Sequence, residues 1–207
     1  MDLRNLIVTR VDIARLSKDL DELGHPGRLW AVHQWTPSDM AKLWDAAHGF
    51  RPITLDDFVP SSVEPLVEVI HHGKNSLGAF QFFEKRFCRP KEAPKDGEPP
   101  HLFGLNRQSI SPATGPGYFV AHPAAGEGAA GGEVDIDYTM LAKEKVPSWP
   151  PIEPAGARLG RFIYQGTVDV MRGISSHVTI GRARRKRGWM NAWFVLVRED
   201  PKPAAAA

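Results

Sequence analysis

Five basic side chains crowd one short segment near the carboxyl-terminal end and form the clearest charge signal in the chain. The segment reads Arg182-Ala183-Arg184-Arg185-Lys186-Arg187-Gly188. The whole chain has a net charge of only +2, so without these five charges it would be net acidic. Arg184, Arg185, Lys186 and Arg187 could bind the phosphates of a nucleic acid or an anionic membrane surface. The alternative is a solvated turn whose charges keep a hairpin from aggregating.

Acid–base chemistry would need a carboxylate or an imidazole inside a cavity, and Asp137 and His177 are the candidates. Asp137 stands between Ile136 and Tyr138 in a segment of alternating polarity. If it lay inside a barrel it would need a partner such as Arg172 or His177. A raised carboxylate pKa would then make it a possible general base. Asp169 and Arg172 are the alternative pair, either as a buried network or as a surface ion pair at i,i+3 spacing.

The histidines do not have the spacing of a metal site. His71 and His72 are adjacent in an expected strand, so their side chains point to opposite faces. His101, His122 and His177 fall in or near separate strands and could converge with Asp135 or Asp137, but the chain contains no HExxH motif and nothing in the spacing demands a metal. We therefore expect neither a metal nor any other cofactor.

The cysteine count and the amino terminus bound the cellular setting. Cys88 is the single cysteine, so no intramolecular disulfide can form, which fits a reducing compartment. Cys88 is expected to be buried and inert, although Arg86 and Arg89 could activate it. The first residues do not resemble a secretory signal, and no apolar run is long enough to span a bilayer. We expect a soluble cytoplasmic protein.

Aromatic residues are numerous enough to line an apolar pocket. The chain has six Trp, ten Phe and three Tyr. Such side chains supply large buried areas both in plain cores and in ligand pockets. An acidic group on a bound ligand could be met by Arg172. The aromatic candidates for the pocket are Phe80, Phe82, Tyr118, Tyr138, Trp149 and Phe162.

Hydrophobic periodicity predicts three helices. The first runs from about Val11 to Leu23 and stops at Gly24. The second runs from Pro37 to His48 behind the N-cap Thr36. The third is expected from about Ala157 to Arg172, where Gly166 and β-branched residues leave a strand as the alternative.

The rest of the chain is typical of antiparallel strands separated by turns. The last strand is apolar on both faces, so it needs a covering layer, either the preceding helix or a ligand in a cavity. Helices first and strands afterwards give an α+β plan. We expect one domain over residues 1–200, a strongly curved sheet or a β-barrel, and a disordered tail at 201–207. The expected strands are Leu66–His72, Leu77–Phe87, His101–Gln108, Tyr118–His122, Glu133–Thr139, His177–Ala183 and Trp189–Arg198.

The carboxyl-terminal forty residues resemble a known kind of protein. The pattern combines a tyrosine, an Asp-x-x-Arg pair, a strand with a glycine, a basic turn and an apolar last strand. It is carried by Tyr164, Asp169, Arg172, Val178, Gly181 and Phe194-Val195-Leu196. It is similar to the end of small bacterial lipocalin-like families, including those named for a GxWxG motif, which is itself absent here. The resemblance implies a lipocalin-like barrel with an apolar cavity and no fixed catalytic set.

Three functions remain open at this stage. The first is binding of an apolar small molecule, such as a lipid, in a cavity. The second is a cofactor-free isomerase, cyclase or hydrolase in the same cavity, with Asp137 or His177 as acid or base. The third is binding of nucleic acid or another anion through the basic segment. A binder tolerates the loss of Asp137, whereas an anion binder loses affinity with added salt.

Overall fold

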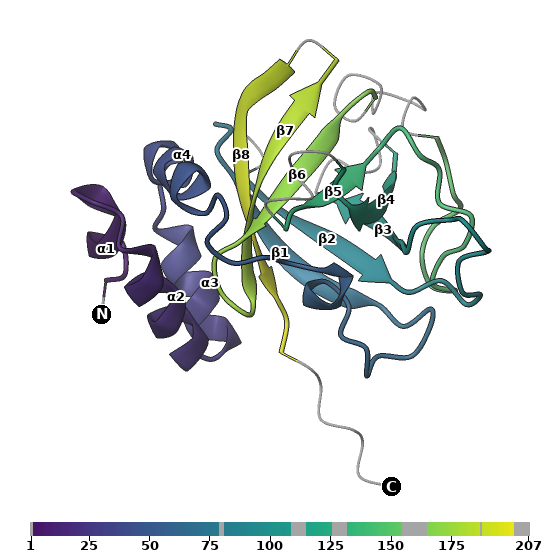
Figure 1. The fold of residues 1–207 in the computed structure, drawn as a ribbon, viewed down its shortest axis with the longest axis horizontal. Helices are drawn as coiled ribbons and strands as arrows, with labels where there is room; N and C mark the ends of the chain where they lie inside the picture. Colours follow the sequence, from purple (N-terminus) through teal and green to yellow (C-terminus); the bar gives the residue numbers. More distant parts are fainter. Residues whose placement is uncertain are drawn as a thin grey trace, which may run out of the picture.

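The fold is that of a computed structural model, which describes residues 2–78, 81–108, 115–125, 132–154, 165–186 and 188–200. Within these residues, helices occupy the amino-terminal quarter and strands the remainder (Figure 1). The helices are α1 (Asn5–Val8), α2 (Ile13–Glu22), α3 (His25–His33) and α4 (Pro37–Ala46), followed by the short 3-10 helix η1 (Leu55–Asp57).

Local capping explains where the two longest helices begin. The Asp12 side chain accepts a hydrogen bond from the Arg15 backbone N–H at the start of α2. At α4, Thr36 and Asp39 form a reciprocal capping box, and Pro37 occupies the first turn. Both devices satisfy backbone donors that have no partner within the helix. The predicted helices from Val11 and from Pro37 are therefore confirmed, each ending one or two residues early.

The described strands close into an eight-stranded antiparallel barrel in which each strand pairs with the next and β8 pairs with β1. The predicted α+β fold class, in its barrel form, is confirmed. Sequential antiparallel pairing needs only short connections, and closure leaves no open sheet edge. The strands are β1 (Val69–Asn75), β2 (Phe82–Cys88), β3 (Leu102–Arg107), β4 (Gly117–Pro123), β5 (Val134–Asp137), β6 (Val168–Gly173), β7 (Val178–Arg185) and β8 (Gly188–Arg198).

Alternation along each strand divides the side chains between the inside and the outside of the barrel. On β8, Phe194 and Leu196 join the interior cluster, while Val195 and Val197 join a cluster on the outer face. This division explains why β8 is apolar on both faces: each face is covered by a different layer.

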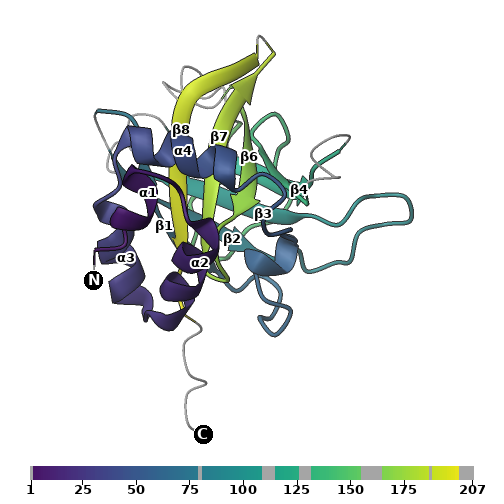
Figure 2. The same ribbon diagram turned by 60° about the vertical axis from the view of Figure 1, so that its left-hand side comes forward.

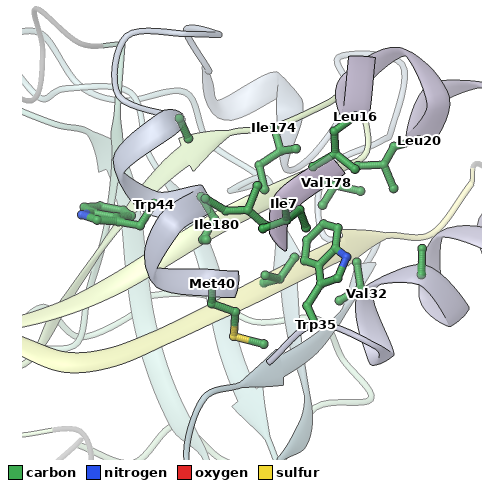
Figure 3. Close-up of a cluster of buried hydrophobic side chains, with 14 of the residues drawn as sticks. Ile7, Leu16, Leu20, Val32, Trp35, Met40, Trp44, Ile174, Val178 and Ile180 are labelled. Carbon is green, nitrogen blue, oxygen red and sulfur yellow. The ribbon is translucent and has the colours of Figure 1, made fainter. Parts of the chain in front are cut away.

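The amino-terminal helices supply the outer layer over β6, β7 and β8 (Figure 2). Leu16 and Met40 of these helices, and Trp35 between α3 and α4, belong to one buried cluster with Val178 and Ile180 of the barrel wall (Figure 3). Trp35 is completely buried. The covering layer that β8 requires therefore comes from the start of the chain rather than from a helix just before the last hairpin.

One end of the barrel is filled by the segment around η1. Phe58 and Val59 are fully buried in the interior cluster. His71 lies on the inner side of β1, and its Nε2 is 2.9 Å from the Phe58 carbonyl oxygen. The Phe58 ring stacks on His71 and also contacts Phe87. This plug makes the interior at that end a packed core.

The third predicted helix is wrong over its described part, residues 165–172. Val168–Gly173 form strand β6, which pairs with β5 and β7. Residues 157–164 lie outside the described part. Asp169 and Met171 face the interior while Val170 packs under the helices, so both faces are covered and no polar alternation marks a strand. Among the described helices, none is long and apolar enough to cross a bilayer.

Candidate functional site in the barrel interior

A lysine lies inside the barrel, on a strand whose other inward residues are aromatic. Alternation on β2 turns Phe83, Lys85 and Phe87 inward. The Lys85 side chain is only 3% exposed. Removing an ammonium group from water costs several kcal/mol unless charged and polar partners compensate. The surroundings of Lys85 must therefore contain such partners.

Two neighbouring strands provide them. The Lys85 Nζ donates to the Asp169 Oδ2 on β6 at 3.0 Å, and to the hydroxyl of Tyr138 just after β5. Asp169 is itself buried. A lysine ammonium carries three N–H donors. Two go to Asp169 and Tyr138, and the third can serve an oxygen of a ligand.

Four aromatic rings surround the ammonium group. The Lys85 Nζ lies 4.8 Å from the ring centre of Tyr138, 5.1 Å from Phe194, 5.3 Å from Phe119 and 5.7 Å from Phe83. At these distances the negative faces of aromatic rings attract a cation, by about 2 kcal/mol where water is excluded. The cage therefore offsets part of the cost of burying Lys85 and fixes the position of its Nζ.

Glycines on the neighbouring strands make room for three of these rings. Gly73 is the register partner of Phe83, and Gly104 is that of Phe119. Gly181 pairs with Phe194 in the same way. A Cβ at any of the three would lie 2.3–2.4 Å from the facing ring. Each ring therefore packs directly over the backbone of a glycine on the inner wall. Such a close approach is a common reason for a glycine inside a strand.

The protonation of Lys85 is balanced between two opposing effects. Burial lowers its pKa from the ordinary value of 10.5, while the charge and the hydrogen bond of Asp169 oppose this shift. A lysine with a lowered pKa releases its proton more easily and can act as a nucleophile or as a general base. Asp169 and Tyr138 are close enough to exchange protons with it.

A cavity of about 140 Å³ adjoins this cluster. Its mainly apolar lining includes Phe83, Tyr138, Trp193 and Phe194, and its polar lining includes Lys85 and Asp169. Cavities of this size in protein cores hold a molecule about as large as benzene. The arrangement can therefore seat one small ring or branched group with a polar atom near Lys85.

Of the aromatic residues predicted to line a pocket, Tyr138 does so, whereas Tyr118 and Trp149 lie on the outside of the barrel. The Tyr118 hydroxyl donates to the Pro150 carbonyl at 2.6 Å, and the Trp149 Nε1–H donates to Glu68 at 2.8 Å. Both pack on the outer face of β3 and β4. Trp149 also borders a wide outer hollow of about 1020 Å³ beside β2 and β3.

The remaining aromatic predictions divide in two. Phe82 is 52% exposed and contacts the His33 ring outside the barrel. Phe80 and Phe162 lie outside the described residues.

The structure separates Asp137 from His177. Asp137 alternates with the inward Ile136 and Tyr138, so it faces outward, 3.9 Å from His122. Burial tends to raise its pKa, but hydrogen bonds from His122 and Thr139 outweigh this and lower it. His177 lies in the turn between β6 and β7, beyond the far end of β6 from Asp137. The predicted interior general base at Asp137 is therefore wrong in position and in the direction of its pKa.

Arg172 is also on the outer face. Its Nε pairs with Glu133 and its guanidinium stacks 3.7 Å from the ring centre of Trp44 on α4. The prediction of a buried network at Asp169 holds, but the partner is Lys85, because Asp169 and Arg172 point to opposite sides of β6. An acidic group of a ligand in the cavity would meet Lys85 instead of Arg172.

The basic segment forms the β7–β8 hairpin, and several of its charges have partners within the protein. Arg184 pairs with the buried Asp135 at 2.7 Å, and the Arg185 Nε donates to Thr167. Lys186 is exposed at the turn. Arg187 lies outside the described residues. Three of the four predicted anion-binding residues, Arg184, Arg185 and Lys186, thus lie on the described part of this hairpin, and Arg184 pairs with the barrel wall through Asp135.

Comparisons with known proteins give no match: neither a family model, nor a curated protein, nor a solved structure corresponds to this chain. The site is therefore interpreted from its own geometry. Lys85 was missed in the sequence, although it stands at the i+2 position between Phe83 and Phe87, which share its face in a strand. That pattern of a lysine between two inward aromatics was the available signal.

Proposed function

We propose that the protein binds a small, mainly apolar molecule that carries one polar group in the barrel cavity. The observation that carries this proposal is the caged Lys85, paired with Asp169 and Tyr138, at the wall of the cavity. Binding sites for small molecules are typically apolar hollows with a few convergent polar groups. A buried ion pair contributes little to stability, which favours a role in recognition.

The cavity defines the chemical class of the ligand. A ring-sized apolar part would contact Phe83, Trp193 and Phe194, and its carbonyl or carboxylate oxygen would accept a hydrogen bond from Lys85. The volume favours a compact molecule over a long lipid chain. The resemblance to lipocalin-like families supports ligand binding inside a barrel, with the difference that a charged group forms part of the wall here.

Native mass spectrometry of the purified protein tests this proposal, followed by denaturing extraction of the molecule that co-purifies. We expect wild type and Lys95→Met to retain the same small molecule, and Lys85→Met to lose it. Lys95 is an exposed lysine on the loop between β2 and β3, so its variant removes a charge without touching the cavity. Equal retention by Lys85→Met, or an absence of ligand in wild type together with no binding of added benzoate or benzaldehyde, would contradict the proposal.

A second candidate function is a cofactor-free enzyme acting on an aldehyde or ketone. The proximity of Lys85, Asp169 and Tyr138 favours it. Asp169 can accept a proton from the Lys85 ammonium, and the free amine can then attack the carbonyl carbon. A C–N bond forms, the carbonyl oxygen leaves as water after protonation, and an imine on Lys85 results. Tyr138 is placed to donate a proton to the departing oxygen.

Reductive trapping separates this enzyme from a plain binding protein. Benzaldehyde and cyanoborohydride at pH 7 should convert an imine on Lys85 into a stable benzyl amine, located by peptide mapping. We expect Lys85 to be modified faster than the exposed Lys95 despite its burial. Modification of exposed lysines alone, together with intact benzoate binding, would leave a binding protein without imine chemistry.

A further inference from the structure

A second cluster of chemically capable side chains lies outside the barrel, where α3 meets β1 and the end of β8. His25 is the first residue of α3, His72 faces outward on β1, and Glu199 follows β8. One ligand atom from each residue lies within 4.8 Å of those of the other two. Among the described residues, these three are the one group of histidine, cysteine or carboxylate side chains that lies close enough to share a metal ion.

Strand pairing brings His72 and Glu199 together. His72 is the register partner of Val197 on β8. The chain continues beside β1, because the Glu199 backbone N–H donates to the Ile70 carbonyl at 2.9 Å. The Glu199 Oε1 consequently lies 2.9 Å from the His72 Nε2. Both side chains are about one-third exposed, so a dissolved ion can reach them.

The start of α3 is held over the same spot by Asp200. This carboxylate accepts hydrogen bonds from the His25 backbone N–H and from the Arg28 side chain. The His25 ring centre lies 5.2 Å from that of His72. The His25 Nδ1 is 3.2 Å from the Arg198 carbonyl oxygen. With its proton on Nδ1, His25 donates to that carbonyl and leaves a lone pair on Nε2.

We propose that His25, His72 and Glu199 bind a divalent transition-metal ion, with Zn²⁺ as the best-fitting cation. Two imidazoles and one carboxylate form a donor set that Zn²⁺ accepts, whereas Mg²⁺ and Ca²⁺ prefer oxygen ligands. The hydrogen bond from His25 to the Arg198 carbonyl matches the outer contacts that orient metal-bound imidazoles. Partial exposure leaves the remaining coordination position to water.

Some of the neighbouring charged groups favour the binding of a cation at this cluster, and others oppose it. Asp200 adds a carboxylate beside the cluster, although it already pairs with Arg28 and lies 3.5 Å from the His177 Nδ1. Arg28 and Arg198 repel a cation. The bound ion would join the helical layer to β1 and β8, so its binding should stabilise the folded chain. The site is independent of the barrel cavity, because His72 and its inward neighbour His71 face opposite sides of β1.

Metal titration of the tag-free, EDTA-dialysed protein tests this site. Isothermal titration calorimetry with ZnCl₂ should show one site per chain, and MgCl₂ should give no comparable heat. His25→Ala and His72→Ala should each weaken Zn²⁺ binding by at least about 10-fold. The control His33→Ala removes an exposed histidine at the other end of α3 and should bind Zn²⁺ like wild type.

Thermal unfolding gives a second readout that does not depend on any activity. Zn²⁺ should raise the Tm of wild type and of His33→Ala, but not that of His72→Ala. Absorption of the Co²⁺-loaded protein should change in Glu199→Gln if the carboxylate is a ligand. The proposal is overturned if the His25 and His72 variants bind Zn²⁺ as tightly as wild type, or if wild type binds none.

Discussion

At the scale of single residues, the main question is why a folded barrel keeps a lysine and an aspartate in its interior. The Lys85–Asp169 pair is satisfied by direct contact, by Tyr138 and by an aromatic cage. Even so, such a pair usually contributes less to stability than apolar residues of similar volume. A site that serves function should therefore be replaceable without loss of the fold, provided that both charges are removed.

The double substitution Lys85→Met with Asp169→Leu tests this view. Lys85→Met alone should lower the free energy of unfolding by about 3–5 kcal/mol, because it leaves the Asp169 carboxylate buried without its cation. The double variant should be as stable as wild type or up to about 4 kcal/mol more stable. Urea denaturation at pH 7 measures both, and the double variant should have lost the ligand.

The two single variants also serve as controls for the double variant. Asp169→Leu alone should also be destabilising, because it leaves the Lys85 ammonium buried among the aromatic rings without its carboxylate partner. If the double variant is as unstable as the worse of the two single variants, the pair stabilises the fold in its own right. The functional interpretation of the buried charges would then lose its main support.

At the scale of elements, the cross-strand pairs of glycine and phenylalanine are what shape the interior. Gly104 is opposite Phe119, and a Cβ there would lie 2.3 Å from the ring and 2.6 Å from the Arg86 carbonyl oxygen. Neither can move far, because the ring packs in the core and the carbonyl belongs to the backbone of β2. Small changes in volume at such positions are therefore costly.

Gly104→Ala should lower the free energy of unfolding by about 1–3 kcal/mol through overpacking, and it should also weaken ligand binding by displacing a ring of the cage. Gly78→Ala is the matched control, because a Cβ at Gly78 meets nothing within 4 Å. Chemical denaturation and ligand titration of both variants measure the two effects. Equal stability of the two variants would contradict this prediction, because it would mean that the barrel wall can shift to accommodate the added methyl group at position 104.

The β7–β8 hairpin gives a second prediction at this scale. Arg184 pairs with Asp135, whose pKa is raised by burial against the opposing effect of that arginine. Arg184→Ser should therefore cost about 1–2 kcal/mol, less than a fully buried pair because Arg184 is half exposed. Lys186→Ser should stay within about 0.5 kcal/mol of wild type. Thermal unfolding compares the two variants.

Nucleic-acid binding by the same hairpin is tested separately. Fluorescence anisotropy with a labelled single-stranded oligonucleotide should show a strong salt dependence if the hairpin is an anion-binding surface. Affinity at physiological salt that falls on Lys186→Ser, without a change in stability, would favour this partner over a purely structural hairpin.

The elements also show how far the sequence could lead. Turn residues and apolar runs predicted seven of the eight described strands, because strand ends are often marked locally by glycine, proline and polar residues. The first strand was expected at Leu66–His72 but lies at Val69–Asn75. Val168–Gly173 was mistaken for helix because β6 is covered on both faces. The helix α3 was overlooked because its apolar face is weakly marked. Pro26 and Gly27 in its first turn are residues typical of a loop.

The candidate site was harder to predict than the fold. Tyr138 was recognised, but its partners Lys85 and Asp169 come from strands far apart in the chain, and closure of the barrel brings them together. The same holds for His25, His72 and Glu199, which converge only when β8 pairs with β1. Local pattern predicts which face a residue takes, whereas the register of distant strands decides its neighbours.

At the scale of the whole molecule, the two ends of the barrel have opposite character. One end carries the cavity beside Lys85, and the other is plugged by Phe58 against His71. The second nitrogen of His71, Nδ1, is buried and has no hydrogen-bond partner among the described residues. A proton there would create a charge in an apolar core, next to rings that leave it no acceptor.

Acid should therefore unfold the molecule from this plugged end. Burial lowers the pKa of His71 from 6.5 to about 3. Below pH 6.5 this histidine is protonated in the unfolded chain, whereas in the folded chain it stays neutral until about pH 3. The free energy of unfolding therefore decreases as the pH is lowered from 6.5 to 3. The loss attributable to His71 should reach roughly 3–5 kcal/mol at the acid end.

His71→Phe isolates this effect, because it keeps an aromatic ring against Phe58 and Phe87 but cannot be protonated. It should cost about 1 kcal/mol at pH 7 through the lost hydrogen bond to the Phe58 carbonyl. Between pH 6.5 and 3 its stability should decline less steeply than that of wild type, in urea denaturation at closely spaced pH values. The control variant His101→Phe, at a half-buried position just before β3, should follow wild type. If the free energies of unfolding of wild type and His71→Phe decline in parallel with falling pH, protonation of His71 costs the folded state little. Other groups then control acid unfolding.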